Sequence, residues 1–222
     1  SCAPVGNEVI AELGGVMTWI RSTTCIAMSL AAAAAWTAPA AAQVQRQAPP
    51  ETMQVEDQPG YEPNAEEERL PATFQRQLVF FRTTEAPGTI IVHTSERFLY
   101  LVQGNNRALR YGIGVGRDGF QWQGLVKISR KAEWPDWTPP PEMIARQPYL
   151  PRFMAGGPGN PMGARALYLG QTVYRIHGTN QPQTIGEAVS SGCFRLVNPD
   201  VSDLYDRVPV GTRVVVKQAP EM

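Results

Sequence analysis

The sequence contains few residues of the kinds that bind metals or form disulfide bonds. It has two histidines and three cysteines among 222 residues. Cys2 and Cys25 lie in an N-terminal segment that we expect to be removed, which leaves Cys193 alone. One cysteine cannot form a disulfide framework. The remaining soft or imidazole ligands, His93, His177 and Cys193, are too few for a structural zinc site, which takes four. We therefore expect no metal.

Charged residues are also scarce. They make up 18% of the chain and the formal net charge is zero, which argues against a nucleic acid partner. The charge is unevenly distributed, because residues 77–222 carry 16 Lys and Arg against 11 Asp and Glu, whereas residues 43–75 carry seven acidic and two basic residues. A mildly basic domain behind an acidic segment is compatible with an anionic polymer or surface as partner.

The N-terminal apolar run is too short to cross a membrane. About twelve residues from Cys25 to Trp36 span about 18 Å as a helix, whereas the hydrocarbon core is about 30 Å thick. Arg21 precedes the run and Ala40–Ala42 closes it, which is the pattern of a secretory signal peptide. A lipid-anchoring cysteine would follow such a run, but Cys25 begins it. We assign residues 1–42 to an upstream leader and signal peptide, and expect no integral membrane segment after cleavage.

Residues 43–77 are rich in Gln, Pro, Glu and Ala and have no apolar periodicity. This composition predicts a disordered linker that holds a domain away from a surface. A folded pattern begins near Leu78, so we predict one domain over residues 78–222.

Short runs of β-branched and aromatic residues predict a domain that is mostly β with minor helix. Residues 89–94 (TIIVHT) and 97–102 (RFLYLV) are strand candidates, and a Gly-Asn-Asn turn leads into the alternating run ALRYGIGVG. This order is typical of a β-meander. Further strands are expected at residues 124–129 and in the runs ALYL, TVYRIH and RVVVK.

A long proline-rich loop interrupts these strands. Residues 133–163 carry eight prolines, and so long a loop in a compact domain is unusual unless it forms a lid or binds a ligand. Trp134 and Trp137 lie at its start and are candidates for substrate binding, as a lid or a sugar-stacking face. Rigid polyproline-like packing against the sheet is the alternative.

Two short helices are predicted to flank Cys193. Thr184–Glu187 has the T-x-x-E form of a capping box and predicts a helix of one or two turns. Downstream, Asn198 is expected to cap a second helix in which Pro199 takes the first position. Apolar residues continue at helical spacing as far as Val208.

The stretch RIHGTNQPQTIGEAVSSGCFRLVN places His177 and Cys193 sixteen positions apart, each beside a glycine. A thiol nucleophile needs a base or a positive neighbour, because a free thiol with a pKa of about 8.5 is mostly protonated at pH 7. His177 closes a predicted strand, and a turn at Gly192 would let backbone N–H groups converge on a substrate oxygen. These are the components of acyl transfer through a thioester. The residues alone leave open that the cysteine is a buried hydrophobe and the histidine a satisfied core or surface residue.

The motif resembles that of the L,D-transpeptidase (YkuD-type) catalytic domain. The family pattern is His-Gly, a spacer, and Ser-(His or Ser)-Gly-Cys-apolar-Arg, which stands here as His177-Gly178 and then Ser190 to Arg195. The segments LYLV, YGIGVGR, AEWPDWTPPPEM and VPVGTRVVV also look like family segments, so the resemblance covers roughly residues 88–217. Ser191 stands where many members have a second histidine. The resemblance implies a serine-bearing branch in which this position shapes the site.

The resemblance implies a β-sandwich fold and work on peptidoglycan in the periplasm or cell-wall space, without a cofactor. In the implied reaction, Cys193 attacks the carbonyl of the third stem residue and expels D-Ala, with His177 as base or ion-pair partner. The carbonyl of Gly178 would orient the histidine, and amides near Gly192 would hold the oxyanion. An amine from a second stem then gives a 3→3 cross-link. Arg195 is a candidate for binding stem carboxylates, or else a solvated or structurally paired arginine.

Several alternatives remain open at this stage. Water as acceptor would make the protein an L,D-carboxypeptidase, and an amine of an envelope protein would make it a protein-to-wall tether. Ser191 also leaves open a catalytically silent wall-binding module. A papain-like protease is disfavoured because its cysteine would precede its histidine.

Overall fold

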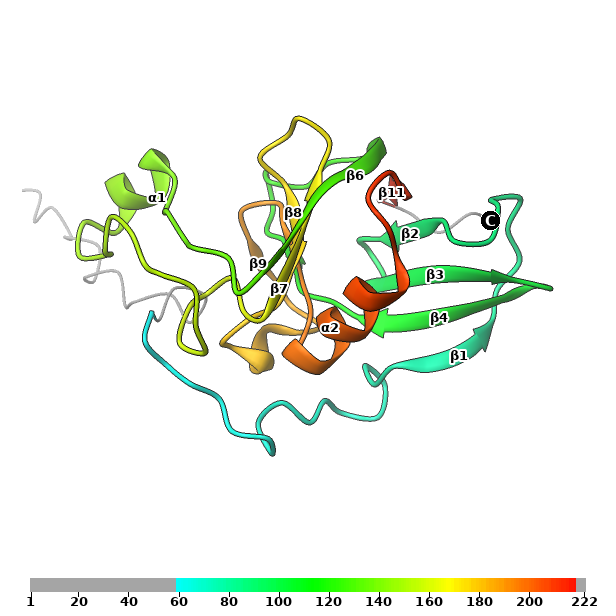
Figure 1. Cartoon of the computed structure of the whole chain (residues 1–222), viewed down its shortest axis with the longest axis horizontal. Coiled ribbons are helices and arrows are strands. Elements are labelled where there is room, and N and C mark those ends of the chain that lie inside the picture. Colours follow the sequence, from blue (N-terminus) through cyan, green and yellow to red (C-terminus); the bar gives the residue numbers. More distant parts are fainter. Residues whose placement is uncertain (1–58, 219–222) are drawn as a thin grey trace, which may run out of the picture. The chain divides into compact units, whose positions relative to one another are not determined.

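The computed structural model describes residues 59–218 (Figure 1). The expected leader, signal peptide and first part of the linker lie outside these residues. Over the part that is described, no helix is both long enough and apolar enough to cross a membrane.

The described chain is mostly β-structure with few helices, as predicted. Nine strands form one sheet in the order β1-β4-β3-β2-β11-β6-β7-β8-β10, and β5 and β9 pair separately. The strands are β1 (Gln77–Phe80), β2 (Ile90–His93), β3 (Phe98–Gly104), β4 (Arg107–Gly112), β5 (Val115–Gly116), β6 (Gly124–Glu133), β7 (Arg165–Leu169), β8 (Arg175–His177), β9 (Ala188–Ser190), β10 (Phe194–Arg195) and β11 (Arg213–Lys217). The helices are α1 (Pro141–Arg146) and α2 (Asn198–Arg207), with a 3₁₀ turn at Pro182–Thr184.

Strand β6 belongs to both halves of this sheet. Its first residues pair with β11, and its later residues pair with β7 after a register shift between Ile128 and Arg130. Figure 1 shows β1, β3 and β4 together on one side of β6, whereas β7 and β8 lie on its other side. The main core contains residues of both halves, such as Leu99 on β3 and Leu167 on β7, so the two halves pack face to face as in a sandwich.

The strands form because their apolar residues alternate between two faces. On β3, Leu99 and Leu101 join the main core, while Tyr100 and Val102 pack in a second cluster. The same alternation made these strands predictable from sequence.

The segment before Cys193 is not the predicted helix. Only a 3₁₀ turn forms at Pro182–Thr184, and it ends where the helix is expected to begin. Gly186 has φ of +89°, which no α-helix allows. Thr184 donates its hydroxyl to the Gln181 carbonyl instead of capping a helix.

Helix α2 lies where it is predicted, but the expected cap is wrong. Val197 is the N-cap residue, and Asn198 is already the first residue of the helix. No side chain within the described residues caps the helix with a hydrogen bond at this end. The Asn198 side chain instead joins two distant segments: Oδ1 accepts from the Ala164 N–H at 2.8 Å, and Nδ2 donates to Glu68 at 2.9 Å.

Residues 59–76, which we call the strap, pack on the domain. Leu70 is buried beside Ile185 and Val197, and Arg76 forms a 3.0 Å ion pair with Asp203 on α2. The prediction of a disordered linker is therefore wrong for this part of the chain. Its apolar contacts come from two well-spaced residues, Leu70 and Phe74, which give no periodic signal.

The proline-rich loop has a small core of its own. Trp137, Leu150 and Met162 are buried together against Ala166 on β7. Helix α1 is its only helix among the described residues. This packing fixes the loop over the end of the β7–β8 pair.

Candidate active site

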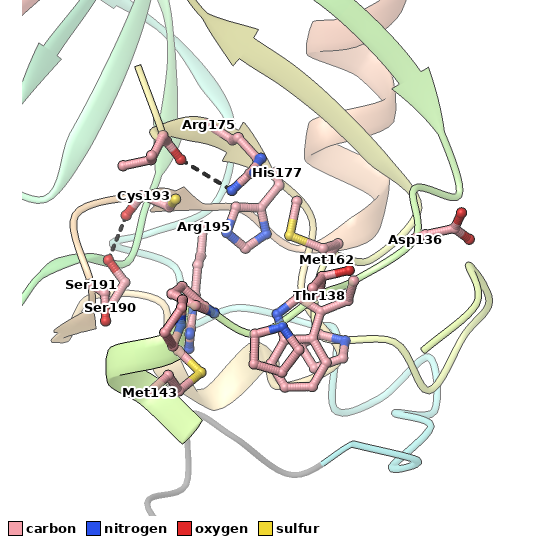
Figure 2. Close-up of a pocket in the computed structure, with 16 residues that line it drawn as sticks. Asp136, Thr138, Met143, Met162, Arg175, His177, Ser190, Ser191, Cys193 and Arg195 are labelled. Carbon is pink, nitrogen blue, oxygen red and sulfur yellow. Dashed lines mark hydrogen bonds between the residues drawn. The ribbon is translucent and has the colours of Figure 1, made fainter. Parts of the chain in front are cut away.

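A cavity of about 410 Å³ is bounded by β8, the start of β10 and the proline-rich loop (Figure 2). Its walls include four residues of the motif, His177, Ser191, Cys193 and Arg195, together with Trp137 of the loop. The structure thus gathers these five predicted site residues around one space.

Neighbouring strands place the histidine and the cysteine. Strands β8 and β10 are parallel, with His177 opposite Arg195, and the Leu196 N–H donates to the His177 carbonyl at 2.9 Å. Cys193 comes directly before β10. The thiol and the imidazole therefore reach the same cavity from adjacent strands, as Figure 2 shows.

The imidazole of His177 is held by a backbone carbonyl. It is 5% exposed, and Nδ1 lies 2.6 Å from the Gly178 oxygen. A carbonyl oxygen only accepts, so Nδ1 carries the proton and Nε2 carries the lone pair. Burial, and next the charge of Arg195, lower the pKa of His177 to about 3. The ring is therefore neutral at pH 7.

The thiol of Cys193 is also in its neutral form. Burial raises its pKa, while the charge and hydrogen bonds of Arg175, and the charge of Arg195, act in the opposite direction. A half-buried thiol with a raised pKa beside a neutral imidazole favours transfer of a proton to His177 during attack over a preformed ion pair.

Arg175 is a site residue that the sequence analysis missed. It lines the cavity, and its charge is the largest influence that opposes the effect of burial on the pKa of Cys193. Side chains two apart on a strand point to the same face. Arg175 lies two residues before His177 on β8, so strand periodicity was the signal that would have found it.

Ser190 and Gly192 shape the turn that carries Cys193. Gly192 has φ of +103°, and a Cβ there would lie 2.5 Å from Cε1 of Tyr174. Ser190 Oγ donates to the Cys193 carbonyl at 2.6 Å and accepts from the Gly192 N–H at 3.2 Å. The Gly192 amide is thus engaged inside the turn, which differs from the expectation that it holds an oxyanion. Ser191 Oγ is buried without a hydrogen-bond partner among residues 59–218.

The remaining predicted residues divide between two cavities. Arg195 and Trp137 are buried and line the cavity that holds Cys193. Trp134 is 42% exposed and lines a separate cavity with Arg130 and Tyr168. The structure therefore does not bring Trp134 to the cysteine.

No group of three or more His, Cys, Asp or Glu side chains comes together as a metal site within the described chain. Besides one thiol, one imidazole and two guanidinium groups, the wall of the cavity includes the carboxylate of Asp136 and the hydroxyl side chains of Thr138, Ser190 and Ser191.

Comparison with known proteins identifies the family of this chain. Residues 87–216 match the model of the L,D-transpeptidase catalytic domain (YkuD). The chain therefore belongs to the family of L,D-transpeptidase catalytic domains. Whether it lies in a serine-bearing branch of that family stays a prediction.

Two relatives from Escherichia coli K12 are named probable L,D-transpeptidases. ErfK/SrfK is 40% identical over 157 residues, which cover 67% of this chain and 49% of that protein. YbiS is 40% identical over 147 residues, which cover 62% of this chain and 47% of that protein. The chain thus spans about half the length of these relatives.

A solved structure from Brucella melitensis, described as a probable carnitine operon oxidoreductase, is also similar. It is 51% identical and covers 69% of this chain and 100% of its own, with a TM-score of 0.46.

Proposed function

We propose that this protein is an exported peptidoglycan L,D-transpeptidase that forms 3→3 cross-links through an acyl-enzyme on Cys193. The observation that supports it best is the pair of parallel strands that delivers His177 and Cys193 to one cavity. Membership of the family supplies the substrate class, the tetrapeptide stems of peptidoglycan.

In the first half-reaction, Nε2 of the neutral His177 takes the thiol proton while the sulfur attacks the carbonyl carbon of the third stem residue. The C–N bond to the terminal D-Ala then breaks, and the leaving amine receives the proton from His177. The products are a thioester on Cys193 and free D-Ala. The positive charge of Arg175 stabilises the sulfur while it carries negative charge.

In the second half-reaction, an amine of another stem attacks the thioester carbonyl. The amine loses a proton through His177 to the departing sulfur, and the new amide is the cross-link. The thioester conserves the energy of the original amide bond, so the chain's own residues suffice for both halves. We assign the binding of a stem carboxylate to Arg195, and its burial in the wall of the cavity supports this role.

The cellular location belongs to the same proposal. The signal-like segment in residues 1–42 supports export to the periplasm or cell-wall space, where peptidoglycan stems are found. Envelope proteins are further candidate acceptors, because any unprotonated amine that enters the cavity can attack the thioester.

Other acceptors would use the same acyl-enzyme. Water would give an L,D-carboxypeptidase, and an amine of an envelope protein would give a tether to the wall. In both cases D-Ala is released without a stem dimer. A wall-binding module without catalysis would release nothing.

The test is mass spectrometry of residues 43–222 incubated with a purified disaccharide-tetrapeptide, alongside Cys193→Ala. Loss of D-Ala together with a dimer mass, both absent from the variant, is the expected result. Loss of D-Ala without a dimer would replace the cross-linking proposal by one of the alternative acceptors. If the folded wild-type protein does not react at all, the proposal that it is an enzyme is wrong.

A further inference from the structure

We propose that Glu68 of the strap, acting through Asn198, is a positioning residue for His177. The proposal deepens the proposed function and rests on it for its kinetic test. Glu68 lies 109 positions before His177 in a part of the sequence without any apolar pattern, and nothing in the motif points to it.

The hydrogen bonds of Asn198 fix the orientation of its side-chain amide. Oδ1 accepts from the backbone N–H of Ala164 at 2.8 Å, and Nδ2 donates to Oε1 of Glu68 at 2.9 Å. A backbone N–H only donates and a carboxylate only accepts. Rotating the amide by half a turn would oppose donor to donor and oxygen to oxygen. Glu68 and the Ala164 N–H therefore together select the rotamer in which Oδ1 faces the backbone.

Asn198 Oδ1 lies tightly against the backbone that holds the histidine. A Cβ on Gly178 would lie 2.5 Å from this oxygen, and a Cβ on Gly163 would lie 2.4 Å from it. The Gly178 carbonyl is the group that binds Nδ1 of His177, and the residue before Gly163, Met162, lines the cavity. Asn198 thus packs between two backbone segments that both supply walls of the active site.

The contacts continue in one line from the strap to the imidazole. Glu68 orients Asn198, Asn198 packs on Gly178, and the Gly178 carbonyl orients His177. Without Glu68, the Asn198 amide loses one of the two partners that fix it, and the Ala164 N–H alone holds its oxygen beside Gly178. The expected consequence is a wider range of imidazole orientations and fewer productive encounters between Nε2 and the thiol.

Other contacts attach the strap independently of Glu68. Leu70 is buried, Arg76 pairs with Asp203 at 3.0 Å, and the Gly60 N–H donates to the Gly159 carbonyl at 2.8 Å. Substitution of Glu68 should therefore leave the strap in place, so its effect on the site can be measured without detaching the segment.

The test compares Glu68→Ala, Glu68→Gln and Glu66→Ala in residues 43–222. The Gln side-chain oxygen can accept the same hydrogen bond from Asn198, whereas Ala cannot. Glu66 is an exposed strap residue, so its substitution controls for loss of an acidic charge. We expect Glu68→Ala to lower kcat on the order of tenfold with KM within about twofold of wild type. Glu68→Gln and Glu66→Ala should keep kcat within about twofold.

A second readout does not require activity. The proton on Nδ1 of His177, bound at 2.6 Å to the Gly178 oxygen, should give a strongly deshielded NMR signal. We expect this signal to broaden or shift in Glu68→Ala and to return in Glu68→Gln. If the wild-type protein does not react with stems, the proposed function fails, but the NMR comparison still tests the positioning role.

Three results would overturn the inference. The first is a wild-type kcat and an unmoved Nδ1 signal in Glu68→Ala. The second is an equal loss of kcat in Glu66→Ala, which would assign the effect to charge. The third is a Glu68→Gln variant as impaired as Glu68→Ala, which would show that the hydrogen bond is not what matters.

Discussion

At the scale of single residues, the site is built from neutral partners. His177 is neutral because it is buried beside Arg195, and Cys193 is protonated because partial desolvation raises the pKa of its thiol. Arg175 is the residue that most opposes the effect of burial on the thiol. The rate at which Cys193 reacts should therefore depend on Arg175 and on pH. It should not depend on a positively charged His177 in the free enzyme.

Alkylation by iodoacetamide tests this interpretation, because residues 43–222 contain no other cysteine. The rate should rise steadily from pH 6 to pH 9 as the thiol ionises, without a step near the ordinary histidine pKa. Arg175→Gln should slow alkylation at pH 8 on the order of tenfold, as expected for a thiol pKa raised by about one unit.

Arg130→Gln is the matched control, because its guanidinium lies over Tyr168 and lines the neighbouring cavity. Its alkylation rate should equal that of the wild type. A rate that is already maximal at pH 6 would mean that the thiolate is preformed and would contradict the neutral pair.

The low pKa of His177 also makes folding depend on pH. The folded-state pKa is about 3, whereas an unfolded histidine titrates near pH 6.5. Between these values the unfolded chain binds a proton that the folded chain does not, so this group lowers stability as pH falls from about 6.5, on the order of 1.4 kcal/mol per pH unit.

Urea unfolding of the wild type and His177→Gln at pH 7.5 and pH 5 measures this contribution. The wild type should lose about 2 kcal/mol more than the variant between the two pH values. Asp200, whose pKa is raised by burial to about 6, acts with the opposite sign in both proteins and cancels in the comparison. Equal losses would mean that His177 is protonated in the folded protein.

At the scale of elements, the turn before β10 requires glycine at position 192. Gly192→Ala combines a left-handed φ with a Cβ that would meet Tyr174 at 2.5 Å, whereas Gly211→Ala has φ of +92° and open space. Both variants should lower the free energy of unfolding by about 1 kcal/mol from backbone strain, and Gly192→Ala by roughly 1–3 kcal/mol more from the collision. Denaturant midpoints would check this, and equal losses would show that Tyr174 moves aside.

The elements also show which parts of this fold can be predicted from the sequence. Strands with two-residue alternation and the His177–Cys193 motif were predictable, because both are local patterns. The helix expected at Thr184 was not correct, because Gly186 adopts a conformation that the capping-box letters do not reveal. Arg175 needed only the strand period to be found. Glu68 had no signal, because its role depends on a contact with Asn198 across 130 positions.

At the scale of the whole molecule, the strap belongs to the folded unit. Residues 77–222 alone would lose the buried Leu70, the contact of Phe74 with Phe98 and the Arg76 ion pairs. We expect the free energy of unfolding of this shortened chain to be roughly 2–5 kcal/mol lower than that of residues 43–222. Leu70→Ala should reproduce a large part of the loss. Equal stability of the long and short chains in urea would contradict a structural role for the strap.

The position of β11 has a consequence for how the protein is made. This strand lies between β2 and β6 in the sheet, although it comes last along the described chain. Until β11 has been synthesised, no hydrogen bonds join the strands β1, β4, β3 and β2 to the strands β6, β7, β8 and β10 at this position in the sheet. Strand β2 pairs with a strand that lies more than a hundred residues later in the chain. Contacts between such distant residues form slowly, so this pairing should be a slow step in folding. The sheet therefore cannot close before residues 213–217 are available, and until then the edges of β2 and β6 that face β11 stay unpaired.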